Sequence, residues 1–103
     1  MPNVVVQYRT KPERAAENQA LVERVFAELN EMDRTGLSYV SLRLEDGVSF
    51  VHVVIEDEAG GSVSLADVPA FQAFTADIAE RCDEQPVAMG ATVVGSHGSV
   101  IRS

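Results

Sequence analysis

Hydrophobic and polar residues alternate along two neighbouring segments of the chain, 37–44 and 48–56. Alternation with a period of two is typical of β-strands, because successive side chains of a strand point to opposite faces. The two segments are separated by Asp46-Gly47, and this dipeptide between alternating runs is a strong signal for a hairpin. The pattern therefore predicts an antiparallel hairpin with Asp46-Gly47 as a two-residue loop.

A two-residue loop defines the register of the hairpin and its two faces. The predicted pairs are Tyr39 with Val54, Val40 with Val53, Ser41 with His52, Leu42 with Val51, and Arg43 with Phe50. One face is uniformly apolar and carries Val40, Leu42, Leu44, Val51, Val53 and Ile55. The other face is mixed and carries Tyr39, Ser41, Arg43, Phe50, His52 and Val54. We expect the helices of the fold to cover the uniformly apolar face, which leaves the mixed face for a partner or a ligand.

The chain before the hairpin predicts a strand followed by a helix. The strand covers residues 3–9, and the segment from Thr10 to Glu13 has the composition of a capping box. The helix continues to about Asp33, with Gly36 as a residue that suits its termination. Its apolar stripe has helical spacing and consists of Val22, Val25, Phe26, Leu29 and Met32.

The chain after the hairpin predicts a second helix and a last strand. A polar loop with two glycines, 57–64, precedes the helix, and we expect it to be among the most mobile segments. The helix is expected over about 67–82, with Pro86 ending it and a strand following over 87–95.

These elements follow the order β-α-β-β-α-β, which is an α+β arrangement of the ferredoxin-like type. Right-handed crossovers give a four-stranded antiparallel sheet in the order 4-1-3-2, with both helices on one face. We expect one domain over residues 1–103. Because no segment is left to cover the second face of the sheet, we also expect a homodimer.

Composition narrows the classes of partner and site. The net charge of −8 argues against a nucleic-acid partner, since such binding depends on Lys and Arg. No apolar run reaches the length of about 18 residues that a membrane span needs. The single cysteine, Cys82, makes no internal disulfide, which favours a cytoplasmic location. Two histidines far apart from it have no metal-ligand spacing, so we expect no metal. Gly60-Gly61 lacks a Gly-x-Gly-x-x-Gly context, so we expect no dinucleotide site, and we expect no other cofactor.

With this order of elements, the chain resembles the dimeric α/β-barrel superfamily, in particular the small proteins grouped with antibiotic-biosynthesis monooxygenases. The resemblance spans nearly the whole chain and depends on the order of the elements and on two stretches, residues 50–58 and 69–81. It implies two sheets that face each other across a dimer and enclose a pocket. It also implies cofactor-independent oxidation of polycyclic aromatics or oxidative breakdown of haem. The chain contains no tryptophan, and Gly60-Gly61 stands where many members carry a histidine, so we expect no haem degradation.

The mixed face of the hairpin carries the candidate site. His52 is the expected catalytic base, because an ordinary histidine titrates near neutral pH, and Tyr39 or Arg43 would hold an oxyanion. The expected ligand-binding residues are Gln7, Ser41, Arg43 and Phe50. One structural alternative is that His52 is satisfied by Ser41 across the strand pair or by water at the dimer interface. The other is that Arg43 forms a surface or interface ion pair.

Two functions from different classes follow from this site. The first is a small-molecule-binding enzyme, a cofactor-independent oxygenase or isomerase that acts on an aromatic or polyketide-like compound. The second is a non-catalytic binding or interaction module whose sheet face serves only dimerisation. A closed pocket at which His52 and Tyr39 converge would favour the enzyme.

Overall fold

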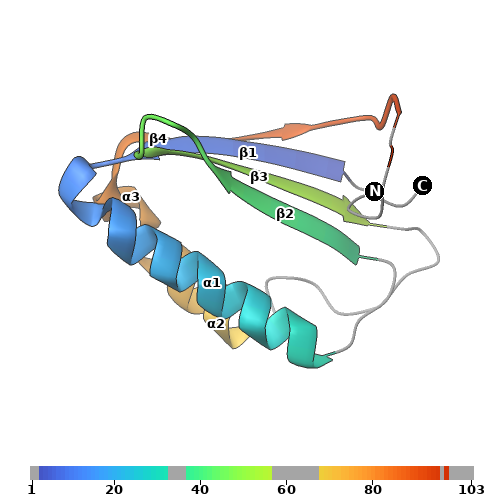
Figure 1. Ribbon diagram of the computed structural model, residues 1–103, viewed down its shortest axis with the longest axis horizontal. Coiled ribbons are helices and arrows are strands. Elements are labelled where there is room, and N and C mark those ends of the chain that lie inside the picture. Colours follow the sequence, from blue (N-terminus) through green and yellow to red (C-terminus); the bar gives the residue numbers. More distant parts are fainter. Residues whose placement is uncertain (1–2, 33–36, 57–67, 96, 98–103) are drawn as a thin grey trace.

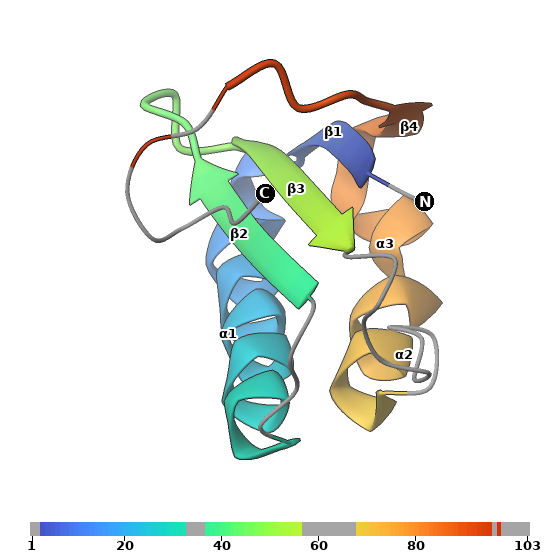
Figure 2. The same cartoon turned by 90° about the vertical axis from the view of Figure 1, so that its right-hand side faces the viewer.

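The computed structural model describes residues 3–32, 37–56, 68–95 and 97. Its elements are β1 (Asn3–Thr10), the 3-10 turn η1 (Pro12–Arg14), α1 (Ala15–Met32), β2 (Leu37–Arg43), β3 (Ser49–Glu56), α2 (Pro69–Ala76), α3 (Ile78–Arg81) and β4 (Cys82–Gly90). The four strands form one antiparallel sheet in the order β2-β3-β1-β4, which confirms the predicted topology. The helices lie together on one face of the sheet, as Figures 1 and 2 show from two directions.

The hairpin has the predicted register but a different turn. Ser41 lies opposite His52 and Arg43 opposite Phe50, as expected. The turn, however, is closed by a 2.9 Å hydrogen bond from the amide of Gly47 to the carbonyl of Leu44, which makes Glu45-Asp46 its central pair. Gly47, which follows this central pair, has a positive φ of +79°. The carboxylate of Asp46 accepts hydrogen bonds from the amides at 48 and 49, and these bonds favour the wider turn.

The predicted capping box is wrong, because Thr10 still belongs to the sheet. Its amide donates to the carbonyl of Val48 over 2.8 Å, and its hydroxyl donates to the same oxygen over 3.3 Å. The chain then passes through η1, with Lys11 as its N-cap and no side-chain cap, and α1 begins at Ala15. The stripe of α1 is confirmed where side chains are described: Val22 and Val25 are buried, and Phe26 and Leu29 pack against the core.

The predicted boundary of the last strand is also wrong. The second helix ends at Arg81, after a break at Asp77 that separates α2 from α3, and β4 already begins at Cys82. Pro86 therefore lies inside a strand. It is tolerated because β4 is at the edge of the sheet and its pairing with β1 is irregular between Gln7 and Arg9. Residues 91–95, predicted as strand, have no regular secondary structure.

The prediction of which face the helices cover is wrong. Phe50 and His52 are 2% and 3% exposed beneath the helices, and the ring of Tyr39 lies 4.7 Å from that of Phe26 on α1. The uniformly apolar face is the open one, with Leu42 48% and Leu44 43% exposed. The polar atoms of the mixed face are hydrogen-bonded inside the molecule, so their polarity did not indicate exposure.

The core joins the mixed face of the sheet to α1 and α2. Tyr8 of β1 stacks on Phe50, with ring centroids 5.5 Å apart, and Phe74 of α2 packs against both Tyr8 and His52. Glu28 of α1 accepts a 3.0 Å hydrogen bond from the amide of Ala70, which connects the start of α2 to α1.

Within the described residues, no helix combines the length and the apolar character that a bilayer span requires. The predictions made for Gly36 and for loop 57–64 lie outside the described residues.

Candidate functional site

His52 lies at the centre of a buried polar cluster between the sheet and the helices. Its Nε2 atom is 2.8 Å from the hydroxyl of Tyr8, and its Nδ1 atom is 2.7 Å from the hydroxyl of Tyr39. The hydroxyl of Ser41 lies farther from Nε2, at 3.4 Å. Three adjacent strands supply these four side chains, since β1, β3 and β2 are neighbours in the sheet. The structure thus brings together the two predicted catalytic residues, His52 and Tyr39, on the helix side of the sheet.

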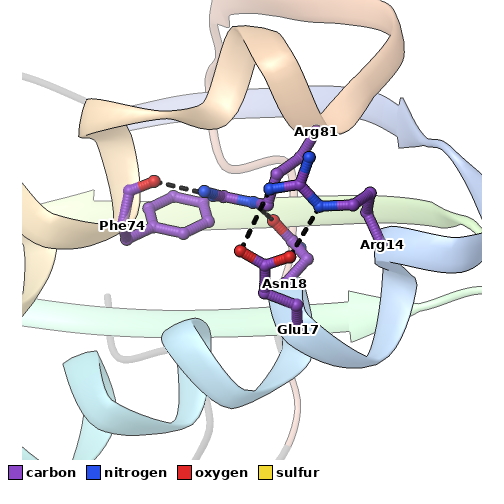
Figure 3. Close-up of polar contacts among 5 residues, drawn as sticks. All are labelled: Arg14, Glu17, Asn18, Phe74 and Arg81. Atoms are coloured by element: carbon purple, nitrogen blue, oxygen red, sulfur yellow. Dashed lines mark hydrogen bonds and ion pairs between the residues drawn. The ribbon is translucent and has the colours of Figure 1, made fainter.

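The cluster continues into the helices through two residues that the sequence analysis did not single out. Asn18 of α1 donates from Nδ2 to the hydroxyl of Tyr8 over 2.9 Å. Arg81 of α3 donates from Nε to Oδ1 of Asn18 over 3.0 Å and from Nη2 to the carbonyl of Phe74 over 2.7 Å. Figure 3 shows Arg81 reaching between Asn18 and Phe74, beside the Arg14–Glu17 ion pair. Both Asn18 and Arg81 are fully buried.

A sequence signal for these two residues does exist. Asn18 is four residues before Val22 and therefore lies on the buried stripe of its helix. Arg81 follows Ile78 by three residues on the inward face of the second helical segment. A polar residue within an apolar stripe is informative, because burial requires a hydrogen-bonding partner.

Burial keeps His52, Tyr8 and Tyr39 neutral at neutral pH. Desolvation lowers the pKa of His52 to about 4, raises that of Tyr8 to about 12, and raises that of Tyr39 far above its ordinary value. The expectation that His52 titrates near pH 7 is therefore wrong. The site as it stands offers neutral hydrogen-bond donors and acceptors rather than a charged base.

A cavity of about 220 Å³ adjoins this cluster between the sheet and α2. It is lined by Val6, Tyr8, Tyr39, His52, Val54, Phe71, Phe74, Thr75, Ile78 and Pro86. Apolar side chains make up most of this lining. Thr75 is exposed and its hydroxyl lies within hydrogen-bonding distance of carbonyls of its own helix, which leaves the Tyr8–His52–Tyr39 group as the polar corner of the cavity. An apolar cleft with a few converging polar groups is the usual form of a small-ligand site.

None of the four predicted ligand-binding residues lines this cavity. Phe50 is a core residue stacked on Tyr8. Arg43 lies at the rim of the sheet, where it donates to Gln19 of α1 over 2.7 Å and to the carbonyl of Gly47 over 2.9 Å. These bonds replace the expected surface ion pair. Gln7 is on the open face of the sheet, so the predicted set is divided between the two faces.

The open face carries a groove of about 580 Å³. Its lining includes Val5, Gln7, Leu44, Val51, Val87 and Met89. Val87 is 58% and Met89 66% exposed, which is unusual for large apolar side chains that share one surface. Among the described residues, no group of three His, Cys, Asp or Glu side chains is arranged to hold a metal ion.

No known family model matches the sequence, and no curated protein matches it either. Solved structures do match the fold. A Caulobacter crescentus protein described as a "putative antibiotic biosynthesis monooxygenase" has 19% sequence identity and a TM-score of 0.66, and the match covers 90% of this chain and 89% of that one.

Two further solved structures have the same fold over nearly their whole length. One is a Mycobacterium tuberculosis protein, with 13% identity, a TM-score of 0.70, and coverage of 93% of this chain and 97% of that one. The other is a Nitrosomonas europaea protein of unknown function, with 17% identity, a TM-score of 0.69, and coverage of 94% and 92%. At these identities the likeness is one of fold. The described ferredoxin-like fold is thus shared with these solved structures.

Proposed function

We propose that this protein binds a small apolar molecule in the cavity between the sheet and α2, and oxidises it as a cofactor-independent monooxygenase-like enzyme. The observation that carries the proposal is the position of the His52–Tyr39 pair in the wall of a cavity that is otherwise apolar. An engineered cavity of about 150 Å³ is large enough for benzene. A cavity of about 220 Å³ therefore suits a larger aromatic or polyketide-like molecule.

The chemistry can proceed without a flavin or a metal when the substrate supplies the electrons. A CH₂ group between two aromatic rings reacts with O₂ to give a ketone and one water, so that atoms and electrons balance. The walls beside the reacting carbon are apolar, and the hydroxyl of Tyr39 offers a hydrogen bond to an oxygen that gains negative charge. His52 joins the hydroxyls of Tyr8 and Tyr39 and acts with Tyr39 as the catalytic pair.

The proposal includes a homodimer formed by the open face of the sheet. That face presents Val5, Val51, Val87 and Met89 to its groove, and Leu42 is exposed beside them. A second copy of the chain has the same apolar surface and can cover it, which would give a dimeric α/β barrel with one ligand cavity in each subunit. The groove then contributes to the interface, and Gln7 with it. The single cysteine favours a cytoplasmic location for this dimer.

The second candidate function is a non-catalytic ligand-binding protein. It is favoured by one observation: both ring nitrogens of His52 already have protein partners, and its pKa of about 4 makes it a weak base at neutral pH. In that case the dimer binds its ligand without converting it.

Oxygen uptake with anthrone, which has a CH₂ group between two aromatic rings, distinguishes the two functions. The enzyme predicts uptake above the rate without protein and a quinone product by mass spectrometry. Thr75 lines the cavity from an exposed position on α2, so the larger side chain of Thr75→Trp should occupy the cavity and abolish uptake. Ala73→Trp is the matched control, because Ala73 is an exposed residue of the same helix that does not line the cavity. Binding of anthrone without uptake would contradict the enzyme and support the binding protein.

A further inference from the structure

Five side chains from five elements form one continuous series of hydrogen bonds. It begins at Arg81 on α3 and ends at Tyr39 on β2. The links are Arg81 Nε to Asn18 Oδ1 at 3.0 Å, Asn18 Nδ2 to Tyr8 Oη at 2.9 Å, Tyr8 Oη to His52 Nε2 at 2.8 Å, and His52 Nδ1 to Tyr39 Oη at 2.7 Å. Four of these residues are at most 5% exposed, so water does not interrupt the series.

The first residue of the series defines the direction of its first two bonds. A guanidinium group donates and never accepts, so Oδ1 of Asn18 must face Arg81 and its Nδ2 must face Tyr8. The oxygen of Tyr8 therefore accepts from Asn18. Among the described residues, its own proton then has one acceptor within reach, Nε2 of His52.

The direction continues through the imidazole ring. A neutral imidazole carries one proton, and if Nε2 accepts, that proton is on Nδ1 and is donated to the oxygen of Tyr39. Ser41 is compatible with this assignment, because its hydroxyl lies 3.4 Å from Nε2 and can donate to it. The opposite tautomer would leave the hydroxyl proton of Tyr8, which is only 5% exposed, without an acceptor.

The hydroxyl proton of Tyr39 remains unused at the end of the series. Within the described part of the chain, no acceptor for it lies within hydrogen-bonding distance, and Tyr39 lines the apolar cavity. Its oxygen already accepts from His52. The cavity should therefore bind most favourably a molecule that has a hydrogen-bond acceptor and no net charge. No described side chain of the cavity lining carries a compensating charge at neutral pH.

From this arrangement we propose that the cavity selects neutral aromatic ketones, whose carbonyl oxygen accepts a hydrogen bond from Tyr39, and that Asn18 and Arg81 are positioning residues for that donor. This inference depends on the ligand cavity of the proposed function but not on oxidation. It names the acceptor that the ligand must carry and the residues that orient the donor toward it.

Calorimetric titration with two molecules of matched shape tests the selection. The ketone 1-tetralone should bind the wild type about 5-fold more tightly than the hydrocarbon tetralin, which corresponds to one neutral hydrogen bond. Tyr39→Phe should remove this preference and leave tetralin binding unchanged. Equal binding of the two molecules by the wild type would overturn the selection while leaving the cavity as a binding site. Binding of neither molecule would overturn both, whereas ketone binding without anthrone oxidation would overturn the oxygenase alone.

The imidazole tautomer tests the direction of the series without any substitution. Long-range ¹⁵N–¹H correlation at pH 7 should show the proton of His52 on Nδ1. The chain has two histidines, so His97→Ala, at an exposed position, assigns the remaining imidazole signals to His52. A proton on Nε2 would overturn the proposal. Asn18→Asp replaces the donor to Tyr8 by an acceptor of the same shape, so it should move the proton to Nε2 and abolish the preference for the ketone. Retention of both properties in Asn18→Asp would show that Asn18 does not orient the donor.

Discussion

Nε of Arg81 donates a 3.0 Å hydrogen bond to Oδ1 of Asn18, although the two residues are 63 positions apart in the chain. This bond joins the end of α3 to the first turns of α1. Arg81 is fully buried, and its guanidinium lies 5.4 Å from the ring centroid of Phe74. Its recorded partners are an amide and a carbonyl rather than a carboxylate. A buried cation held in this way gives the helix layer a defined position relative to the sheet.

We therefore predict that Arg81→Met lowers the free energy of unfolding by about 2–4 kcal/mol, because the amide oxygen of Asn18 and the carbonyl of Phe74 lose their donor. Urea denaturation followed by circular dichroism measures the change. Arg14→Met is the matched control: Arg14 pairs with Glu17 at the surface, and its loss should change stability little. Equal effects of the two substitutions would contradict the role assigned to Arg81.

The low pKa of His52 predicts a pH dependence of stability. The unfolded chain binds a proton at His52 with a pKa of 6.5, whereas the folded chain does so at about 4. Stability from this group is therefore fully present above pH 6.5, decreases as the pH falls toward 4, and is lost below it. Between pH 7 and pH 5 the loss should be about 2 kcal/mol.

The variant His52→Gln separates this effect from that of other groups. Glutamine can accept from Tyr8 and donate to Tyr39, but it does not titrate, so urea midpoints at pH 7 and pH 5 should lie closer together than in the wild type. His97→Ala should leave the wild-type pH dependence unchanged, because His97 is exposed. A wild type that is equally stable at both pH values would show that His52 keeps an ordinary pKa.

The open face of the sheet predicts the effect of charge on assembly. Val53 lies opposite Val5 and Val40 on that face, so Val53→Lys should give a folded monomer by light scattering and circular dichroism. Phe50→Lys should instead unfold the chain, because Phe50 is 2% exposed in the core. Ala16→Lys, at an exposed position of α1, should leave the assembly unchanged. A wild type that is monomeric at micromolar concentration would contradict the proposed dimer.

The hairpin turn predicts different costs for two glycines. Gly47 has a φ of +79°, where a Cβ atom is strained, so Gly47→Ala should destabilise the protein by about 1 kcal/mol. Gly90 has no such φ, and an added Cβ would meet nothing within 4 Å, so Gly90→Ala should be close to neutral. Thermal unfolding of the two variants provides the comparison. A Gly47→Ala variant as stable as Gly90→Ala would mean that the turn relaxes at no cost.

Much of the fold could be predicted from local sequence patterns. The alternation around Asp46-Gly47 determined which residues face each other across the hairpin, and the order of elements determined the sheet order, because both depend on neighbouring residues and on right-handed connections. The stripe of Val22, Val25, Phe26 and Leu29 determined the buried side of α1 for the same reason. Errors at Thr10 and Pro86 arose where strand pairing with distant residues overrode a local signal.

The tertiary structure alone decided which face of the sheet the helices cover. Hydrophobic content favoured the face of Leu42 and Val51, but the other face carries the aromatic rings of Tyr8, Phe50 and Tyr39 that pack against the helices. The polar atoms on that face are satisfied by each other and by Asn18, at separations of 10 to 44 residues. Sequence alone determined the register of Tyr39 and His52. Their enclosure, the low pKa of His52 and the cavity beside it depend on hydrogen bonds and packing between distant segments, which no local pattern records.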